Sequence, residues 1–460
     1  MSRLISWLFT GGLIPIALLL CGGFFWFYLR GMPFLSPRGM LRALRHTSSE
    51  GVSPFRAVTL ALAGTLGVGN VVGVASALLM GGAGAILWMW VSALLAMVLK
   101  YAEILLAVLH RQTDRDGAHH GGAVYYIRTC LRERRHPKLG SILSLIFSLL
   151  MILNALCMGC IVQVNAVAGV FTGALGLPSL CVGFLLLILT VPVILRGTKG
   201  ISALTEYLVP IMSLGYAVLS VAVLLIRREA ILPTLGRILS EACAPMSAPG
   251  GVTGFLTARA LRVGTMRGLL SNEAGCGTAP TAHACANTDT PAAQGVWGIF
   301  EVFVDTIVLC TMTALVILIA FPDLHDFGLS PVMMTVRAYS TVLGKWAEYF
   351  FAAAVFCFGY ATLICWAGYG TESIRAISPK KQYHRFYLSA FCICIPLGSI
   401  IAPNAVWDLS DFAIASLTSI NLTVLLLMRK TIRQETQRFF ARRPPKKVGN
   451  IAALDNSSKT

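Results

Sequence analysis

The sequence predicts an all-α polytopic membrane protein, and its composition is the first observation behind that prediction. Of the 460 residues, 56% are apolar and only 12% are charged, whereas soluble proteins carry about 25% charged residues. Apolar runs of about 20 residues, each long enough to cross roughly 30 Å of hydrocarbon, recur along the whole chain. We expect eleven transmembrane helices, at 11–29, 57–79, 84–109, 141–172, 179–195, 201–226, 264–286, 295–321, 346–372, 386–402 and 408–428.

Two of these spans contain too much glycine for uninterrupted helices. The first holds Gly64-Thr-Leu-Gly-Val-Gly-Asn-Val-Val-Gly73, and the second holds Gly268-Leu-Leu-Ser-Asn-Glu-Ala-Gly-Cys-Gly277. An interruption inside the membrane leaves backbone N–H and C=O groups without partners, which hydrocarbon does not tolerate unless the interruption lines a cavity. A pair of interrupted helices in two corresponding halves is the sequence sign of a binding site in secondary transporters.

Basic residues predict the orientation of the chain. The formal net charge is +17, but 27 of the 37 Lys and Arg residues fall in alternate loops and in the C-terminal tail, as the positive-inside rule requires. This pattern places the N-terminus outside and the C-terminus in the cytoplasm. Because membrane topology and lipid headgroups account for the basic residues, we expect no nucleic-acid partner.

The positions of the two interruptions predict one N-terminal accessory helix followed by a 5+5 inverted repeat. The expected organisation is an outside N-terminus, accessory helix and basic cytoplasmic loop at 1–56, a first five-helix repeat at 57–226, an outside loop with an amphipathic segment at 227–263, a second repeat at 264–428 and a basic cytoplasmic tail at 429–460. Five helices per repeat would make the second copy antiparallel to the first. A further amphipathic segment is expected at 330–345, and a disordered end at the last dozen residues.

The sequence contains no pattern typical of an enzyme. It lacks a Walker motif, a His-Glu-x-x-His motif and a Gly-x-Ser-x-Gly elbow. Most of the 13 cysteines lie inside apolar spans, where cysteine acts as a small hydrophobic residue. We therefore expect a protein without catalytic residues or a cofactor.

The residue types at the two interruptions suit a zwitterion and a cation. Free N–H groups at helix ends can bind a carboxylate, and free carbonyl groups can coordinate Na⁺. The candidates are Gly67, Gly69, Asn70, Ser271, Asn272 and Gly275. Helix packing through small residues remains an alternative at the first interruption, and a simple surface turn at the second.

Glu273 is the only carboxylate in either interruption. A charge at this depth is costly enough to indicate a function. A structural or gating role, such as capping the unwound segment, and direct contact with an ion both remain open.

Polar residues in other spans extend the candidate site. Gln163 and Asn165 lie in one long apolar run, and we expect one of them to face the cavity. Thr362 and Trp366 are four residues apart, so they share a helix face. The hydroxyl group of Thr362 could bind an ion, and the indole group of Trp366 could cover a small substrate.

Two further pairs of charged residues lie in or near spans. Lys100 and Glu103 are one helical turn apart, which predicts that they form an ion pair or that their charged ends extend toward the membrane surface. Glu301 and Asp305 share a helix face, where a proton relay and bonding to a neighbouring helix are both possible.

Several blocks of the chain resemble the alanine/glycine:cation symporter family. They are Gly67-Val-Gly-Asn-Val-Val-Gly-Val-Ala-Ser76, Lys100-Tyr-Ala-Glu103, Gly121-Gly-Ala-Val-Tyr-Tyr-Ile127, Thr205-Glu-Tyr-Leu-Val-Pro210 and Arg267-Gly-Leu-Leu-Ser-Asn-Glu-Ala-Gly-Cys-Gly-Thr-Ala-Pro-Thr-Ala-His283. The resemblance covers about residues 10–430. It implies a sodium-coupled amino-acid symporter with the inverted five-helix-repeat fold, in the cytoplasmic membrane of a bacterium or archaeon.

The same resemblance implies roles for the candidate residues. The backbone around Gly69 and Asn70 and the 271–275 interruption would hold the carboxylate and ammonium groups of the substrate. Gln163 and Asn165 match a polar pair of the family, and the Thr362–Trp366 element would limit the pocket to small side chains.

The coupling ion is expected close to the first interruption. Sodium would bind the backbone near Gly67 and Val68 and the side chain of Thr362. The family usually has Thr at the position of Val68, so this chain lacks a hydroxyl group there.

These observations predict sodium-coupled symport of a small neutral amino acid, alanine or glycine, by a monomer in a lipid bilayer. One alternative is a proton-coupled permease with Glu273 or Asp305 as the proton carrier. Another is an amino-acid sensor that does not transport.

Overall fold

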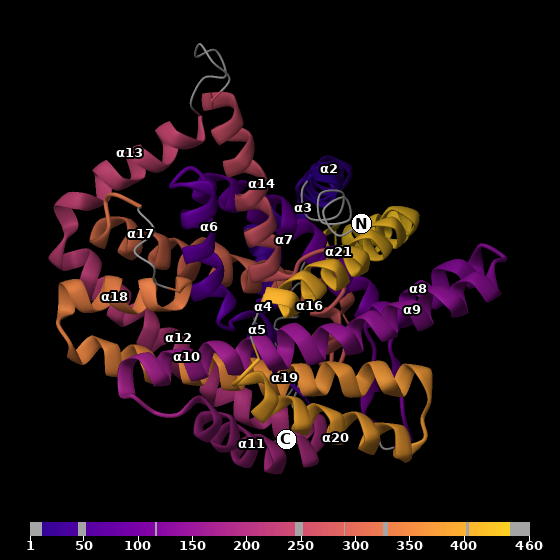
Figure 1. The fold of residues 1–460 in the computed structure, drawn as a ribbon. Helices are drawn as coiled ribbons and strands as arrows, with labels where there is room; N and C mark the ends of the chain where they lie inside the picture. Colours follow the sequence, from indigo (N-terminus) through magenta and orange to yellow (C-terminus); the bar gives the residue numbers. More distant parts are fainter. Residues whose placement is uncertain are drawn as a thin grey trace, which may run out of the picture.

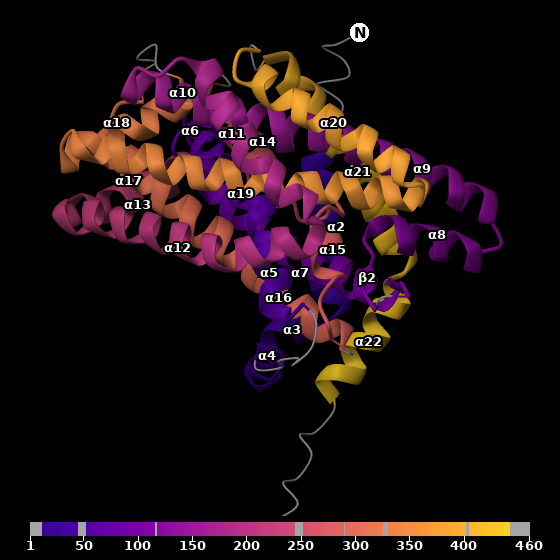
Figure 2. The same cartoon turned by 90° about the horizontal axis from the view of Figure 1, so that it is seen from below.

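The computed structural model describes residues 12–44, 52–115, 117–243, 252–288, 290–324, 330–401 and 404–441. This part of the chain is built almost entirely of helices (Figures 1 and 2). Its two strands, β1 (Gln112–Thr113) and β2 (His119–His120), form one short antiparallel hairpin. The expected disordered end, residues 449–460, lies outside the described residues.

Six described helices are long and apolar enough to cross a membrane. They are α7 (Ala85–Leu109), the continuous helix Pro137–Leu175, α12 (Gly197–Ile226), the continuous helix Pro291–Ala320, α19 (Trp346–Ile377) and most of α21 (Asn404–Leu427). A seventh is formed by α5 (Pro54–Thr65) and the segment Gly69–Gly81, which meet at a bend of 51°. The protein is therefore an all-α polytopic membrane protein.

The remaining predicted spans also contain helices, but these are shorter or less apolar. They are α2 (Ile14–Tyr28), α11 (Ser179–Leu195), α14 (Val252–Asn272) with α15 (Pro280–His283), and α20 (Lys381–Gly398). The total of eleven spans and the inverted repeat therefore remain predictions.

Shorter helices and turns connect the spans. They are α3 (Met32–Leu35), α4 (Pro37–Leu44), α8 (Ala123–Glu133), η4 (Arg228–Ala230), α13 (Ile231–Ala242), α18 (Pro331–Leu343) and α22 (Arg429–Ala441). Helix α18 lies within the expected amphipathic segment, and its N-cap Ser330 accepts a hydrogen bond from the N–H of Met333. The described residues of the other expected segment, 252–262, continue directly into α14 instead of forming a separate helix.

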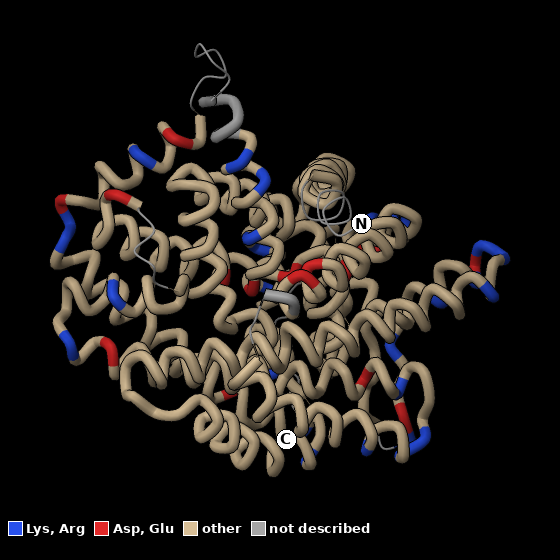
Figure 3. The backbone as a smooth tube through the Cα atoms, in the orientation of Figure 1, with Lys and Arg blue, Asp and Glu red and all other residues tan. Residues whose placement is uncertain are grey.

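The two interrupted helices lie side by side and run in opposite directions. The second half of the first one, α6 (Val74–Gly81), packs against α14 (Figure 1), and its first half, α5, packs against α15 (Figure 2). Helix α7 packs against both α14 and the helix that begins at Pro291. Figure 3 shows most charged residues at helix ends and in loops, with a small acidic group near the centre of the molecule.

Three of the spans contain a π-helical turn. These are η2 (Gly69–Gly73) before α6, η3 (Cys157–Val162) between α9 (Pro137–Leu156) and α10 (Gln163–Leu175), and η5 (Phe303–Cys310) between α16 (Pro291–Val302) and α17 (Thr311–Ala320). Such turns are rare and occur often at functional sites. In this protein they contain or adjoin Asn70, Gln163 and Asp305.

Candidate functional site

The first interruption is stabilised by a side chain from another span. Helix α5 ends at Thr65, and after Leu66 the N–H groups of Gly67 and Val68 make no regular helical hydrogen bonds. The N–H of Val68 instead donates to Oε1 of Gln163 over 3.1 Å. A Cβ atom on Gly67 would lie 2.7 Å from Oγ1 of Thr362 and 2.8 Å from Oε1 of Gln163. Glycine is therefore needed for the close approach of these three segments.

Helix α19 binds the carbonyl groups at the end of α5. Thr362 Oγ1 donates to the carbonyl of Ala63 over 2.8 Å, and Trp366 Nε1 donates to that of Gly64 over 3.2 Å. Trp366 is fully buried and packs on Gly159, where a Cβ atom would lie only 2.3 Å from the tryptophan. The structure thus brings Gly67, Gln163, Thr362 and Trp366 together at one place.

A Gly67→Ala substitution is expected to reduce sodium-dependent uptake strongly, because the new methyl group must displace Thr362 or Gln163. Gly73→Ala is the matched control, since a Cβ atom there meets nothing within 4 Å. Uptake of labelled alanine into proteoliposomes, corrected for the amount of folded protein, measures the difference. Equal uptake by the two variants would contradict the role given to Gly67.

The second interruption is a tight turn with a left-handed backbone. Glu273, Gly275 and Gly277 have φ angles of 51°, 83° and 77°. The left-handed conformation at Glu273 costs about 1–2 kcal/mol for a residue with a side chain. The Asn272 side chain accepts a hydrogen bond from the N–H of Ala274 over 3.0 Å, which satisfies one backbone group in the turn.

Glu273 itself bonds within the turn. Its Oε2 atom accepts a hydrogen bond from Thr278 Oγ1 over 2.6 Å, and the residue is buried. This contact is the kind expected for the structural role considered above, the stabilisation of the unwound segment.

The carboxylate of Asp305 connects the two interruptions. Asn70 Nδ2 donates to Oδ1 over 2.7 Å, Ser271 Oγ donates to Oδ2 over 2.7 Å, and Thr306 Oγ1 lies 2.8 Å from Oδ2. Asn272 Nδ2 in turn donates to Thr306 Oγ1 over 3.2 Å. All of these residues are buried. One acidic side chain from a third helix therefore holds a side chain from each interrupted helix.

Asp305 has only neutral hydrogen-bond donors around it. Within the described ranges, no nitrogen of Lys, Arg or His lies within 4.0 Å of its carboxylate. A buried negative charge without a cation is costly, so this position can stabilise a bound cation or a proton. Sequence reasoning noted Asp305 but left it out of the candidate site, although an acidic residue inside an apolar span was a usable signal.

The predicted ion pair between Lys100 and Glu103 is wrong. Lys100 Nζ lies 3.1 Å from Glu301 Oε1 and donates to the carbonyl of Asn272 over 2.8 Å. Glu103 accepts hydrogen bonds from the N–H of Gly277 over 3.0 Å and from Asn421 over 2.8 Å. Both side chains satisfy backbone groups freed at the second interruption, which helical spacing within α7 does not reveal.

Three other candidates have separate positions. Asn165 Nδ2 donates to the carbonyl groups of Ile401 and Gly398 over 2.9 and 3.3 Å, so it bonds the end of α20 instead of the interruptions. Gly69 lies beside the carbonyl of Leu270, 4.0 Å from the position of a Cβ atom. The carbonyl of Gly275 accepts a hydrogen bond from Asn421 over 2.9 Å.

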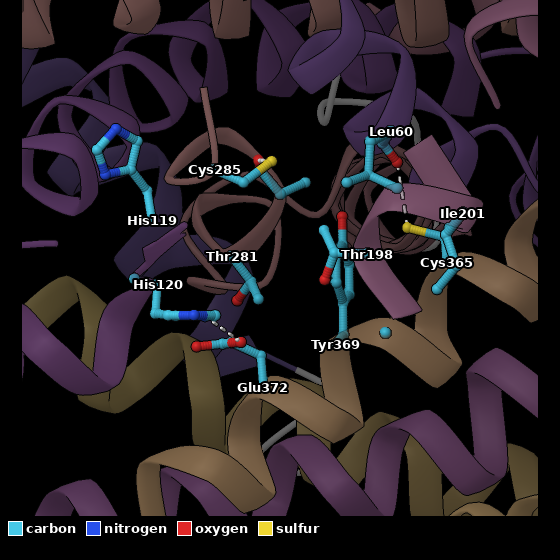
Figure 4. Close-up of a pocket in the computed structure, with 13 residues that line it drawn as sticks. Leu60, His119, His120, Thr198, Ile201, Thr281, Cys285, Cys365, Tyr369 and Glu372 are labelled. Carbon is cyan, nitrogen blue, oxygen red and sulfur yellow. Dashed lines mark hydrogen bonds and ion pairs between the residues drawn. The ribbon is translucent and has the colours of Figure 1, made fainter. Parts of the chain in front are cut away.

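A small pocket, the inner pocket, with a volume of about 30 Å³, lies on one side of the interruptions (Figure 4). Leu60, before the first interruption, and Thr281, after the second, both line it. His120 and Glu372 face each other across one part of the pocket, with Nδ1 and Oε2 3.1 Å apart. The charge pattern of the sequence places this pocket on the predicted cytoplasmic side.

The His120 contact predicts a pH-dependent contribution to stability. The hydrogen bond with Glu372 raises the pKa of His120, helped by Asp114 and opposed by burial and by Arg375. The stabilisation is complete when the pH is below the pKa of His120 in the unfolded chain, about 6.5. It is lost as the pH rises through the higher pKa of His120 in the folded chain. The melting temperature of His120→Gln should therefore fall below the wild-type value at pH 5.5 and approach it at pH 9. His136→Gln, at an exposed position, should show no such trend; a constant difference for His120→Gln would contradict the prediction.

The whole chain matches a known family. The model of the "Sodium:alanine symporter family" aligns with residues 2–452. One relative of this chain is the sodium/alanine symporter AgcS of Methanococcus maripaludis. The two are 34% identical over 441 residues, and the alignment covers 94% of this chain and 95% of AgcS.

Other relatives carry different substrate names. The probable sodium/glutamine symporter GlnT of Bacillus subtilis is 32% identical over 91% of this chain and 86% of its own length. The putative sodium/proton-dependent alanine carrier protein YrbD, also of Bacillus subtilis, is 28% identical over 84% of this chain and 80% of its own length.

Proposed function

We propose, from the premise that this chain belongs to the sodium:alanine symporter family, that it takes up alanine or glycine together with Na⁺. The chain is thus a sodium-coupled amino-acid symporter and not an enzyme. The transport would proceed by alternating access across the cytoplasmic membrane of a bacterium or archaeon.

The observation that carries the proposal is the buried carboxylate of Asp305, which bonds both Asn70 and Ser271. A small amino acid brings one ammonium and one carboxylate group. The carboxylate of Asp305 suits a cation, either the ammonium group or Na⁺ itself. The N-terminal ends of the helices that follow the interruptions suit the substrate carboxylate. A buried charge that contacts both interruptions fits a zwitterion better than a neutral solute.

The proposed sodium ligands are oxygen atoms near the first interruption. Thr362 Oγ1 and the carbonyl of Ala63 already lie 2.8 Å apart, close to the backbone of Gly67 and Val68. Hydroxyl and carbonyl oxygens are suitable ligands for a hard cation. The side chain of Val68 is buried and supplies no oxygen, but its N–H still bonds Gln163.

Trp366 is the proposed limit on substrate size. Its ring is fully buried between α5 and η3, so a large substrate side chain would have to displace it. This favours alanine and glycine over glutamine, the substrate in the name of GlnT.

The test is uptake of labelled alanine into proteoliposomes that contain the purified full chain. We expect uptake with an inward sodium gradient, little uptake when choline replaces sodium, and stronger competition by unlabelled glycine than by glutamine. Stronger competition by glutamine would overturn the substrate, and full uptake in choline would overturn the coupling ion.

Proton coupling is the second candidate, and Asp305 is the observation that favours it, because a buried carboxylate without a cation can bind a proton. A relative is named as a putative sodium/proton-dependent carrier. Uptake in choline that is driven by an inward proton gradient would support this candidate.

A further inference from the structure

A second pocket, the outer pocket, lies on the opposite side of the interruptions from the inner pocket. It has a volume of about 200 Å³, and its lining includes Met80, Arg262, Met266, Arg267, Leu270 and Asp411. Met80 follows the first interruption in the chain, and Met266 and Leu270 precede the second. Because the two interrupted helices are antiparallel, these residues belong to the half of the molecule that faces away from the inner pocket.

The outer pocket lies next to the candidate site along α14. Leu270 lines its wall and directly precedes Ser271, whose hydroxyl group bonds Asp305. The positive-inside pattern places the pocket on the predicted outer side, from which a substrate would enter.

The two walls of the pocket carry opposite charges that attract each other without direct contact. Arg262 and Arg267 come from α14, and Asp411 comes from α21. In the described ranges, neither guanidinium group forms an ion pair with Asp411 within 4.0 Å, and Asp411 Oδ1 is buried without a hydrogen-bond donor. An unpaired buried acceptor is costly, so a donor from a ligand would stabilise this wall.

Apolar groups hold the guanidinium group of Arg267 in place. Its Nη2 atom lies 3.7 Å from the sulfur of Met80, and its Cζ atom lies 5.7 Å from the ring centroid of Trp407. A cation placed over an aromatic ring keeps its N–H groups available for an anion. Trp407 and Asp411 are one helical turn apart on α21, so the ring and the carboxylate are neighbours on the same face.

We propose that the outer pocket is a second binding site for a zwitterionic amino acid, with Arg267 binding the carboxylate group and Asp411 the ammonium group. Because its polar groups are charged side chains of the protein, the outer site should not require Na⁺. The inference rests on the proposed transport only for the choice of ligand.

Saturation binding of labelled alanine to the purified full chain in detergent tests this inference. In NaCl we expect two molecules per chain, and in choline chloride one, because only the site between the interruptions needs sodium. Asp411→Asn should bind one molecule in NaCl and none in choline. Asp408→Asn, which removes an exposed carboxylate one turn earlier on the same helix, should bind as the wild type does.

The analogues lactate and alanine amide test the need for both charges. Lactate keeps only the carboxylate group and alanine amide only the ammonium group. Each should therefore displace the labelled alanine that is bound in choline chloride at least tenfold less well than unlabelled alanine does. Equal displacement by either analogue would overturn the proposal.

Other outcomes also decide the matter. One molecule per wild-type chain in NaCl together with none in choline, or two molecules in NaCl for Asp411→Asn, would overturn the second site. Loss of both molecules in Asp411→Asn would also overturn it, because Asp411 would then act on the inner site through the fold. If Asp411→Asn does not fold, the wild-type counts in NaCl and choline still decide. Failure of the proposed function gives a different result, in which the sodium-dependent molecule is missing and the sodium-independent one remains.

Discussion

Replacing Lys100 with methionine is expected to destabilise the protein by about 3–5 kcal/mol, the usual cost of removing one partner of a buried ion pair. Lys100 and Glu301 have 0% and 1% exposed side chains, with 3.1 Å between Nζ and Oε1. Without the ammonium group, the Glu301 charge keeps only His283, 2.9 Å away, and the weaker contact with Thr65. The carbonyl of Asn272 also loses its donor.

The free energy of unfolding in mixed micelles, from denaturant titration, measures this effect. Lys199→Met removes an exposed lysine and should change it by less than about 0.5 kcal/mol. The double variant Lys100→Met/Glu301→Gln should recover much of the loss, because replacing both charges avoids an unpaired one. A Lys100→Met variant as stable as Lys199→Met would show that the pair does not hold the second interruption.

Replacing Asp305 with asparagine is expected to reduce transport by roughly ten- to a hundredfold or more. Hydrogen bonds to a charged group contribute about 1.5–3 kcal/mol each, and 1.4 kcal/mol corresponds to a factor of ten in affinity. The amide keeps one acceptor oxygen and has an NH2 donor in place of the other, so either Asn70 or Ser271, which both donate to this carboxylate, would face a donor. The side chain could then no longer accept hydrogen bonds from both interruptions.

Two titrations separate the possible roles of Asp305. A rise in the sodium concentration for half-maximal uptake, at saturating alanine, indicates an ion ligand. A rise in KM for alanine, at saturating sodium, indicates contact with the ammonium group. Loss of a proton-driven component indicates a proton carrier. Asp408→Asn is the control, and wild-type values for both titrations in Asp305→Asn would exclude Asp305 from the site.

The fold class and both interruptions were predictable because they depend on local sequence. Apolar runs and clusters of glycine are both contiguous in the sequence, so they can be recognised without knowing the fold. The structure agrees with the predicted interruptions, since α5 ends at Thr65 and α14 ends at Asn272. The amphipathic helix after Ser330 was predictable for the same reason. The number of spans that cross a membrane depends on helix length and tilt, which local patterns do not determine.

The partners of the charged residues were not predictable, because they come from distant segments. Lys100 bonds Asn272, 172 residues away, and Asn70 bonds Asp305, 235 residues away. Spacing along one helix favoured Glu103 for Lys100, but packing against the second interruption decided otherwise. Gln163 and Asn165 are two residues apart and face different neighbours, and no pattern in the sequence indicates which of them reaches Val68.

Asp305 belongs to neither interrupted helix but bonds a side chain from each of them. A cation on its carboxylate would therefore bind well only when both interrupted helices are in place, so its binding energy would depend on their relative position. Thermodynamic linkage makes such dependence reciprocal: if Na⁺ tightens the binding of the amino acid by some factor, the amino acid tightens the binding of Na⁺ by the same factor. One shared carboxylate would thus be enough to make the binding of the ion and the substrate cooperative.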